Sequence, residues 1–114
     1  MGYNLFIDDE RDPVPGIDTV IVRSFEEAVE VMCDMGCPDF ISFDHDLGEG
    51  KNGYDIAKWM IETDLDEEGN FIPYKFKFYV HSQNIIGKEN IEKSIGKYVE
   101  LKNIDKAFWD RFKR

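Results

Sequence analysis

Three short apolar stretches of the chain each end in ionisable side chains that can bind a cation or transfer a proton. The stretches are residues 4–7, 40–43 and 76–80, and the side chains that follow them are Asp8, Asp9, Asp44, His45, Asp46 and His81. Carboxylate oxygens are the ligands that Mg²⁺ prefers, and imidazole is the side chain best suited to gain and lose a proton near neutral pH. The pattern therefore indicates a site that combines a metal ion with a general acid or base.

The acidic residues are expected to meet at one edge of a sheet. In an open α/β sheet, sites lie at the carboxyl ends of the strands where the strand order reverses, which would bring Asp8 or Asp9 close to Asp44. Converging carboxylates repel one another unless their pKa values rise or a hard cation neutralises them. We therefore predict Mg²⁺ (or Mn²⁺) as the cofactor. The candidate metal ligands are Asp8, Asp9, Asp44 and Asp46. Alternatively, Asp9 and the acids that follow it form a solvated loop.

The only two histidines, His45 and His81, both follow predicted strands. Imidazole suits general acid and base catalysis, so we predict His81, His45 and Asp44 as the catalytic residues. His81 is the stronger candidate. Because side chains alternate along an extended chain, His45 points away from Asp44 and Asp46 and can instead orient its neighbours.

Four further residues are candidates for binding a substrate phosphate: Arg11, Ser82, Asn84 and Lys88. Ser82 and Asn84 can donate hydrogen bonds to phosphate oxygens, although Asn84 is better suited to cap the next helix. Arg11 can bind a phosphate with two hydrogen bonds or pair with neighbouring acids on the surface. Gly48, Gly50 and Gly53 match no phosphate-loop motif and are interpreted as loop glycines.

The apolar patterns predict strands that alternate with helices. Strands are expected over residues 3–7, 18–22, 39–43 and 74–80, and helices begin after Ser24, near Gly53 and near Ile85. This alternation is typical of a parallel α/β sheet with right-handed crossovers, and 114 residues suffice for one domain over 1–114. The strict alternation within 74–80 predicts a strand near the edge of the sheet.

The C-terminal segment, residues 97–114, allows two interpretations. The helix can stop at Gly96, leaving residues 98–101 as a fifth strand with Lys102 after it. Alternatively, the helix continues through Gly96 at a cost of about 1 kcal/mol, which we favour. In both cases an apolar stripe is expected to pack back on the domain, and it consists of Ile104, Phe108 and Phe112.

Charge and composition exclude several classes of function. Residues 1–57 carry 14 acidic and 3 basic residues (net −11), whereas residues 58–114 carry 10 and 11 (net +1). The acidic half disfavours binding to a long nucleic-acid duplex. The chain has neither an apolar run of the roughly 18–20 residues that a membrane span needs nor the profile of a signal peptide, so we expect a cytoplasmic protein that does not bind membranes. Cys33 and Cys37 lack partners for a zinc site and are expected to be reduced thiols.

Four motifs together resemble the cyclic-phosphate-processing receiver domains of bacteria and phages, a branch of the response-regulator receiver superfamily. They are LFIDDER (5–11), SFDHDLG (42–48), NGYD (52–55) and VHSQN (80–84). The resemblance covers residues 3 to about 99, with 100–114 as an amphipathic extension. It implies a receiver-like (flavodoxin-like) α/β fold, a three-layer sandwich with a short, mainly parallel sheet of four or five strands.

The same resemblance implies roles for individual residues. Asp8, Asp9 and Asp44 look like the metal-binding pocket of receivers, and Ser82 stands where receivers carry a small hydroxyl residue. His45 and His81 look like the additions that mark the cyclic-phosphate branch. Signalling receivers usually have proline where this chain has Gly48, and their glycine comes one position before Gly53. The receiver lysine would be Lys102 only if a fifth strand forms.

We therefore predict a divalent-metal-dependent phosphoesterase that processes cyclic phosphates. Its expected substrate is a small phosphorylated or cyclic nucleotide, or an RNA end in a setting of RNA repair, and the protein is expected to be a monomer or weak homodimer. Two alternatives stay open. The chain can be a signalling domain phosphorylated on Asp44, or a non-catalytic protein that binds a partner through its acidic face.

Overall fold

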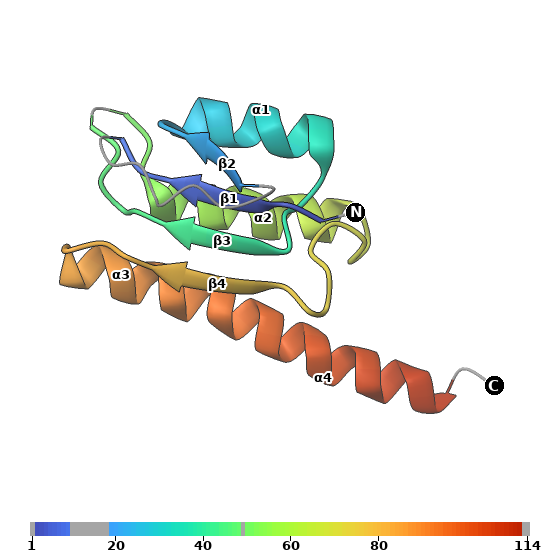
Figure 1. Cartoon of the computed structure of the whole chain (residues 1–114). Helices are drawn as coiled ribbons and strands as arrows, with labels where there is room; N and C mark the ends of the chain where they lie inside the picture. Colours follow the sequence, from blue (N-terminus) through green and yellow to red (C-terminus); the bar gives the residue numbers. More distant parts are fainter. Residues whose placement is uncertain (1, 10–18, 49, 113–114) are drawn as a thin grey trace.

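The computed structural model describes residues 2–9, 19–48 and 50–112, with side chains as far as residue 104. Within these residues a four-stranded parallel sheet forms the centre of the molecule (Figure 1). Its strands are β1 (Asn4–Ile7), β2 (Thr19–Val22), β3 (Phe40–Phe43) and β4 (Lys77–Val80), in the order β2-β1-β3-β4. The strand order reverses between β1 and β3, so the loops after these two strands diverge at one edge.

Side-chain caps define where the helices begin. The helices are α1 (Phe25–Met35), α2 (Gly53–Asp66), α3 (Ile85–Ile91), the π-helical segment η1 (Glu92–Gly96) and α4 (Lys97–Phe112). The Ser24 hydroxyl accepts a hydrogen bond from the backbone N–H of Glu27, as the sequence pattern predicted. Asn52 and Asp55 form a reciprocal capping box at the start of α2.

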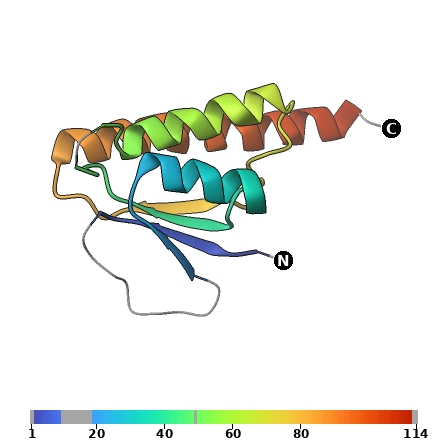
Figure 2. The ribbon, with the colours of Figure 1, turned by 90° about the horizontal axis from the view of Figure 1, so that it is seen from above.

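All of the described helices lie on one face of the sheet, which Figure 2 shows from above. The hydrophobic core fills the space between this face and the helices. Its largest fully buried side chains include Leu5, Ile7, Met32, Ile41, Phe43, Ile56, Met60, Ile91 and Ile95. The predicted receiver-like α/β class is confirmed, with four strands. No described element forms a helical layer on the opposite face of the sheet, so the described part of the chain has two layers where the sequence predicted three.

Strand β4 lies at the edge of the sheet, as the alternating pattern predicted, and it pairs with β3. Phe76 and Val80 are buried, whereas Lys77 and Tyr79 are exposed. The glycine in η1 has a packing role here, because a Cβ atom at Gly96 would lie only 3.3 Å from Cζ of Phe78. Gly96 therefore allows η1 to pack closely against β4.

The helix continues through Gly96 as far as Phe112, so the interpretation that we favoured is confirmed for residues 97–112, and no fifth strand forms in the described residues. Lys102 lies on α4, where its Nζ donates hydrogen bonds to both carboxylate oxygens of Asp64 at 2.8 and 2.9 Å. Asp64 is in the last turns of α2, which begins beside the end of β3. The ion pair is therefore at the opposite end of the molecule from the ends of β1, β3 and β4.

The apolar stripe of the C-terminal extension does not pack back on the domain where its side chains are described. Ile104 is 57% exposed, and α4 extends past the sheet (Figure 1). The expectation is wrong for Ile104 because the sheet ends at β4 and offers no further strand at this position. The side chains of Phe108 and Phe112 lie outside the described residues.

Two smaller points concern the described part of the chain. None of its helices has both the length and the apolar character needed to cross a membrane. Cys33 and Cys37 are both free thiols, and burial raises the pKa of Cys37 to about 12, so this thiol stays protonated at neutral pH.

Candidate functional site

Three residues directly after neighbouring strands form the centre of the candidate site. Asp8 follows β1, Asp44 follows β3 and His81 follows β4. The sheet hydrogen bonds continue into this edge, because the N–H of Asp8 donates to the carbonyl of Val22 and the N–H of His81 donates to the carbonyl of Phe43. The backbone of Asp8 and His81 is thus held by hydrogen bonds of the sheet.

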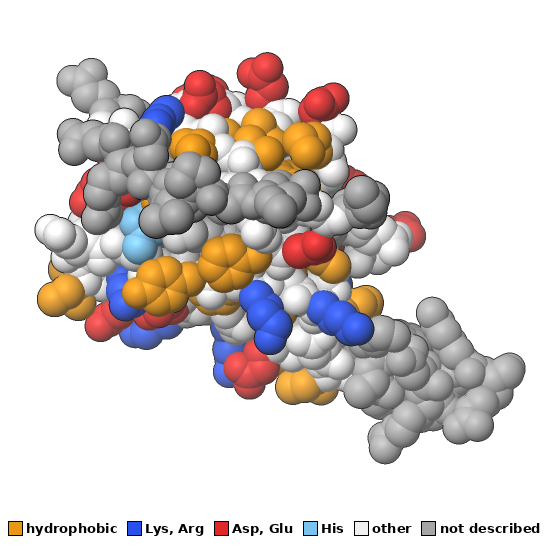
Figure 3. Space-filling model, in the orientation of Figure 1, with side chains coloured by type: hydrophobic (Ala, Val, Ile, Leu, Met, Phe, Trp, Pro, Cys, Tyr) orange, Lys and Arg blue, Asp and Glu red, His pale blue; other side chains and the backbone are white. Residues whose placement is uncertain are grey.

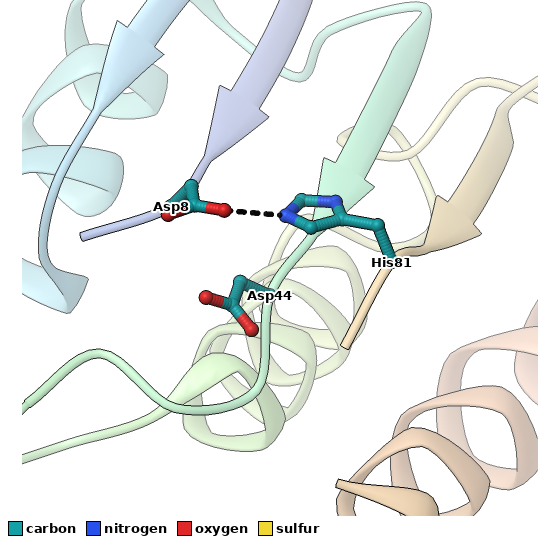
Figure 4. A group of neighbouring side chains, drawn as sticks. All are labelled: Asp8, Asp44 and His81. Carbon is teal, nitrogen blue, oxygen red and sulfur yellow. Dashed lines mark hydrogen bonds and ion pairs between the residues drawn. The ribbon is translucent and has the colours of Figure 1, made fainter. Parts of the chain in front are cut away.

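The side chains of Asp8, Asp44 and His81 converge on one small space (Figure 4). One carboxylate oxygen from each aspartate and one ring nitrogen of His81 all lie within 4.8 Å of one another. Nε2 of His81 is 3.1 Å from Oδ2 of Asp8. Asp8 and Asp44 are buried, and His81 is partly buried. This is the geometry of a site that can hold a cation and transfer a proton.

His81 is fixed on three sides by residues from other strands. In addition to Asp8, its Nδ1 lies 2.7 Å from the hydroxyl oxygen of Ser42, and its ring stacks on Phe6 with centroids 4.9 Å apart and planes at 4°. An ionised Asp8 can only accept a hydrogen bond, which assigns the proton of neutral His81 to Nε2 and makes Nδ1 the acceptor from Ser42. Asp8 thus sets the tautomer of His81, and Ser42 and Phe6 hold the orientation of its ring.

The electrostatics of the site favour a positive charge. Burial raises the pKa of Asp44, and the nearby Asp8 carboxylate raises it further. A bound cation would relieve this repulsion, and carboxylate oxygens are the ligands that Mg²⁺ prefers. The residues present therefore fit the predicted divalent cation.

A glycine brings α2 close to this edge of the sheet. The N–H of Gly53 donates to the carbonyl of His45, and a Cβ at Gly53 would lie 2.1 Å from the carbonyl oxygen of Asp44. Any larger residue would push α2 away from the segment that carries Asp44. Gly53 therefore has a packing role, whereas Gly48 and Gly50 adopt the positive φ angles expected of loop glycines.

His45 and Asp46 lie beside this group, and the structure does not bring them into it. Nδ1 of His45 is 2.9 Å from Oδ1 of Asp46, and the same oxygen accepts a hydrogen bond from the side chain of Asn84. The ring of His45 packs on Gly87, where a Cβ would lie 2.2 Å from Cγ of the ring. The contact with Asp46 contradicts the expectation that His45 points away from this residue. The contacts with Asp46 and Gly87 join the segments after β3 and β4, which agrees with the alternative in which His45 orients its neighbours.

Asp9 is exposed and lies outside the group formed by Asp8, Asp44 and His81, although its charge contributes to the raised pKa of Asp44.

Asn84 caps α3, because its side-chain oxygen accepts a hydrogen bond from the N–H of Gly87 at 2.9 Å. The hydroxyl of Ser82 accepts a hydrogen bond from the N–H of Asn84. Nζ of Lys88 lies 5.9 Å from the ring centroid of Tyr79. Arg11 lies outside the described residues.

Sequence reasoning missed two residues of the site, Ser42 and Phe6. Both lie two positions before a site residue on the same strand, so their side chains share its face of the sheet. The available signal was a polar serine inside the otherwise apolar stretch Phe40–Phe43.

Comparisons with known proteins assign the chain to a family. No curated protein matches it significantly. A solved chain described as amino acids 181–211 of the yeast Spc42 trimeric coiled coil fused to another structure has 16% sequence identity, and the match covers 97% of this chain and 94% of that one, with a TM-score of 0.46. The family model of the cyclic-phosphate processing receiver domain matches residues 3–97, close to the range of the predicted resemblance. The chain therefore belongs to the cyclic-phosphate processing receiver domain family.

Proposed function

We propose that the protein is a divalent-metal-dependent phosphoesterase that hydrolyses cyclic phosphates on nucleotides or RNA ends. The observation that carries the proposal is the convergence of Asp8, Asp44 and His81, whose ligand atoms lie within 4.8 Å of one another at the ends of three adjacent strands. The processing of cyclic phosphates by the family supplies the class of substrate.

Asp8 and Asp44 would hold the metal through their carboxylate oxygens. When bound, a divalent cation polarises phosphoryl oxygens and lowers the pKa of a water molecule. Both aspartates are buried and directly follow strands, so they would hold the cation at a fixed position relative to His81. The exposed Asp9 and Asp46 would add negative charge around this position without contacting the cation.

His81 is the group best placed to move a proton. Hydrolysis of a cyclic phosphate adds water oxygen to phosphorus and breaks one ring P–O bond, so one proton leaves the water and one reaches the departing ribose oxygen. His81 can carry out either transfer, with Asp8 stabilising the imidazolium form across 3.1 Å. The hydroxyl of Ser42 can donate to or accept from Nδ1, so it supports both forms of the ring.

The remaining predicted residues would position the substrate. Ser82 and Lys88 belong to the segment after β4 and are proposed to bind phosphate oxygens, together with Arg11. Asn84 and His45 would contribute by holding that segment against the one after β3. The signalling alternative gains no support from Lys102, which is paired with Asp64 at the far end of the molecule.

A panel of cyclic and linear phosphodiesters, assayed with Mg²⁺, with Mn²⁺ and with EDTA, tests the proposal. We expect ring opening of 2′,3′-cyclic nucleotides only when a divalent cation is present, and loss of this activity in His81→Ala. Undiminished turnover in EDTA would remove the metal from the mechanism. Treatment with a small phosphodonor, followed by intact-mass measurement, would instead reveal the signalling alternative as an adduct lost in Asp44→Asn.

A further inference from the structure

The face of the sheet that points away from the described helices carries aromatic side chains in the rows that precede the candidate site. Register places Phe6, Ser42 and Tyr79 side by side in one row across β1, β3 and β4. Phe40 and Lys77 lie opposite each other in the preceding row. Because every second residue of a strand points to the same face, the next row is formed by Asp8, Asp44 and His81. We refer to Phe40, Lys77 and Tyr79 as the aromatic face.

The two rings of the aromatic face are exposed to solvent, unlike the side chains of the hydrophobic core. Tyr79 is 58% exposed and Phe40 is 36% exposed, whereas the ring of Phe6 is covered by His81. In Figure 3, hydrophobic side chains gather on this face beside a histidine, with basic and acidic side chains around them. Exposed aromatic rings on the face of a sheet are the usual platform on which proteins stack the bases of single-stranded nucleic acids.

Two basic side chains lie near Tyr79 although the chain as a whole is acidic. The protein has a net charge of −10, yet the residues around Tyr79 include Lys77 on the same strand and Lys88, whose Nζ lies 5.9 Å from the Tyr79 ring. Cations beside exposed aromatic rings complement a phosphate backbone and its bases together. They do not favour an apolar protein partner.

The spacing of the rows matches the spacing of a nucleotide chain. Positions two residues apart on one face of a strand are about 7 Å from each other. Tyr79 is two residues before His81, and Phe40 is four residues before Asp44. A terminal nucleotide with its phosphate at Asp8, Asp44 and His81 would thus have its base over Tyr79, and the nucleotide before it would reach Phe40.

We propose that the aromatic face is a base-stacking subsite, and that the substrate is the end of a single RNA strand with Tyr79 and Phe40 stacking its last two bases. This inference rests on the proposed function, because the position of the phosphate defines which base meets which ring. It adds a specificity that the metal and histidine site cannot supply, since a phosphate alone carries no base.

The test measures binding without turnover. The probe is a short RNA with a 3′-terminal phosphate and 2-aminopurine as its last base, whose fluorescence is quenched on stacking. We expect quenching with the wild type, and binding weakened about 5- to 100-fold in Tyr79→Leu, as for the loss of one stacked base. Tyr79→Phe keeps the ring and should retain binding. Leu65→Ala, which removes an equally exposed apolar side chain on α2, should bind as the wild type does.

The possible outcomes separate this inference from the proposed function. Quenching that depends on Tyr79 in a protein without hydrolytic activity would support the subsite and contradict the esterase. Hydrolysis of cyclic nucleotides with equal RNA binding by the wild type and Tyr79→Leu would overturn the subsite alone. A substitution of Tyr79 that changes only self-association, measured by light scattering, would also overturn it, because the face would then be a contact between two copies of the chain.

Discussion

The imidazole of His81 lies 3.1 Å from the carboxylate of Asp8, although the two residues are 73 positions apart in the chain. Strands β1 and β4 are separated by β3 in the sheet, so this contact spans the strand that carries Asp44. The site therefore depends on three strands being in register, and each of its residues can be tested separately.

The contact between Ser42 and His81 predicts a role for a side chain that touches no substrate. Ser42→Ala removes the hydrogen-bond partner of Nδ1 and should lower activity by about 10- to 100-fold, the usual effect of losing such a supporting partner. Ser42→Thr restores a hydroxyl and should recover activity. Ring ¹⁵N chemical shifts of His81 give an independent measurement, and an unchanged Nδ1 shift in Ser42→Ala would contradict the hydrogen bond between Ser42 and Nδ1.

The raised pKa of Asp44 predicts that this carboxylate destabilises the metal-free fold. An acid whose pKa is higher in the folded state binds more protons when folded, so its contribution to the free energy of unfolding falls as pH rises above the ordinary value of 3.8. Asparagine does not titrate, so the Asp44→Asn variant does not lose free energy of unfolding in this way as pH rises. The variant should therefore be more stable than the wild type at neutral pH. Thermal unfolding without metal from pH 3.5 to 7.5 checks the prediction, which fails if the wild type is the more stable protein at pH 7.

The convergence of Asp8 and Asp44 predicts that Mg²⁺ or Mn²⁺ stabilises the fold. A cation at 100 times its dissociation constant should add about 2.7 kcal/mol to the free energy of unfolding. The rise in melting temperature should disappear in Asp8→Asn and Asp44→Asn. The control Asp66→Asn removes an exposed carboxylate at the end of α2 and should keep the full rise. An equal rise in all four proteins would indicate nonspecific binding.

The buried pair of Asp64 and Lys102 predicts a separate, structural dependence on pH. Burial alone would raise the pKa of Asp64, but hydrogen bonds from Lys102, Tyr98 and two backbone N–H groups outweigh it, so the pKa is lowered. The stability from this pair is present above pH 3.8 and is lost as pH falls through the lower folded pKa. Asp64→Asn should cost about 3–5 kcal/mol at pH 7, because it leaves Lys102 buried without its partner.

Urea unfolding of the wild type and Asp64→Asn at pH 7 and near pH 2.5 measures this difference. We expect the two proteins to converge at low pH. A cost that does not depend on pH would show that packing, and not the charge of Asp64, is what the fold requires.

The sequence was sufficient to place the main residues of the site at one edge of the sheet. Asp8, Asp44 and His81 each follow an apolar stretch, and parallel strands bring such positions together whatever their exact register. Ser42 and Phe6 could not be predicted, because their contacts with His81 depend on which residues face each other across β1, β3 and β4.

The contact between Lys102 and Asp64 could not be predicted from the sequence for a different reason. Its contact with Asp64 depends on the path of a helix that runs through Gly96, and sequence alone left that path open. The exposed position of Ile104 follows from the same path, because periodicity shows that a stripe is apolar without showing what covers it.

The central claim is that Asp8, Asp44 and His81 act as one unit on a cyclic phosphate. Its most direct test is the rate of hydrolysis of 2′,3′-cyclic AMP in Mn²⁺ by the wild type, by Asp8→Asn, Asp44→Asn and His81→Ala, and by the double variant of Asp44 and His81. Groups that act together are not additive, so each single variant should lose about 10²- to 10⁴-fold and the double variant should lose little more. A wild type that is folded and binds Mn²⁺ but leaves the cyclic ring intact would contradict the account.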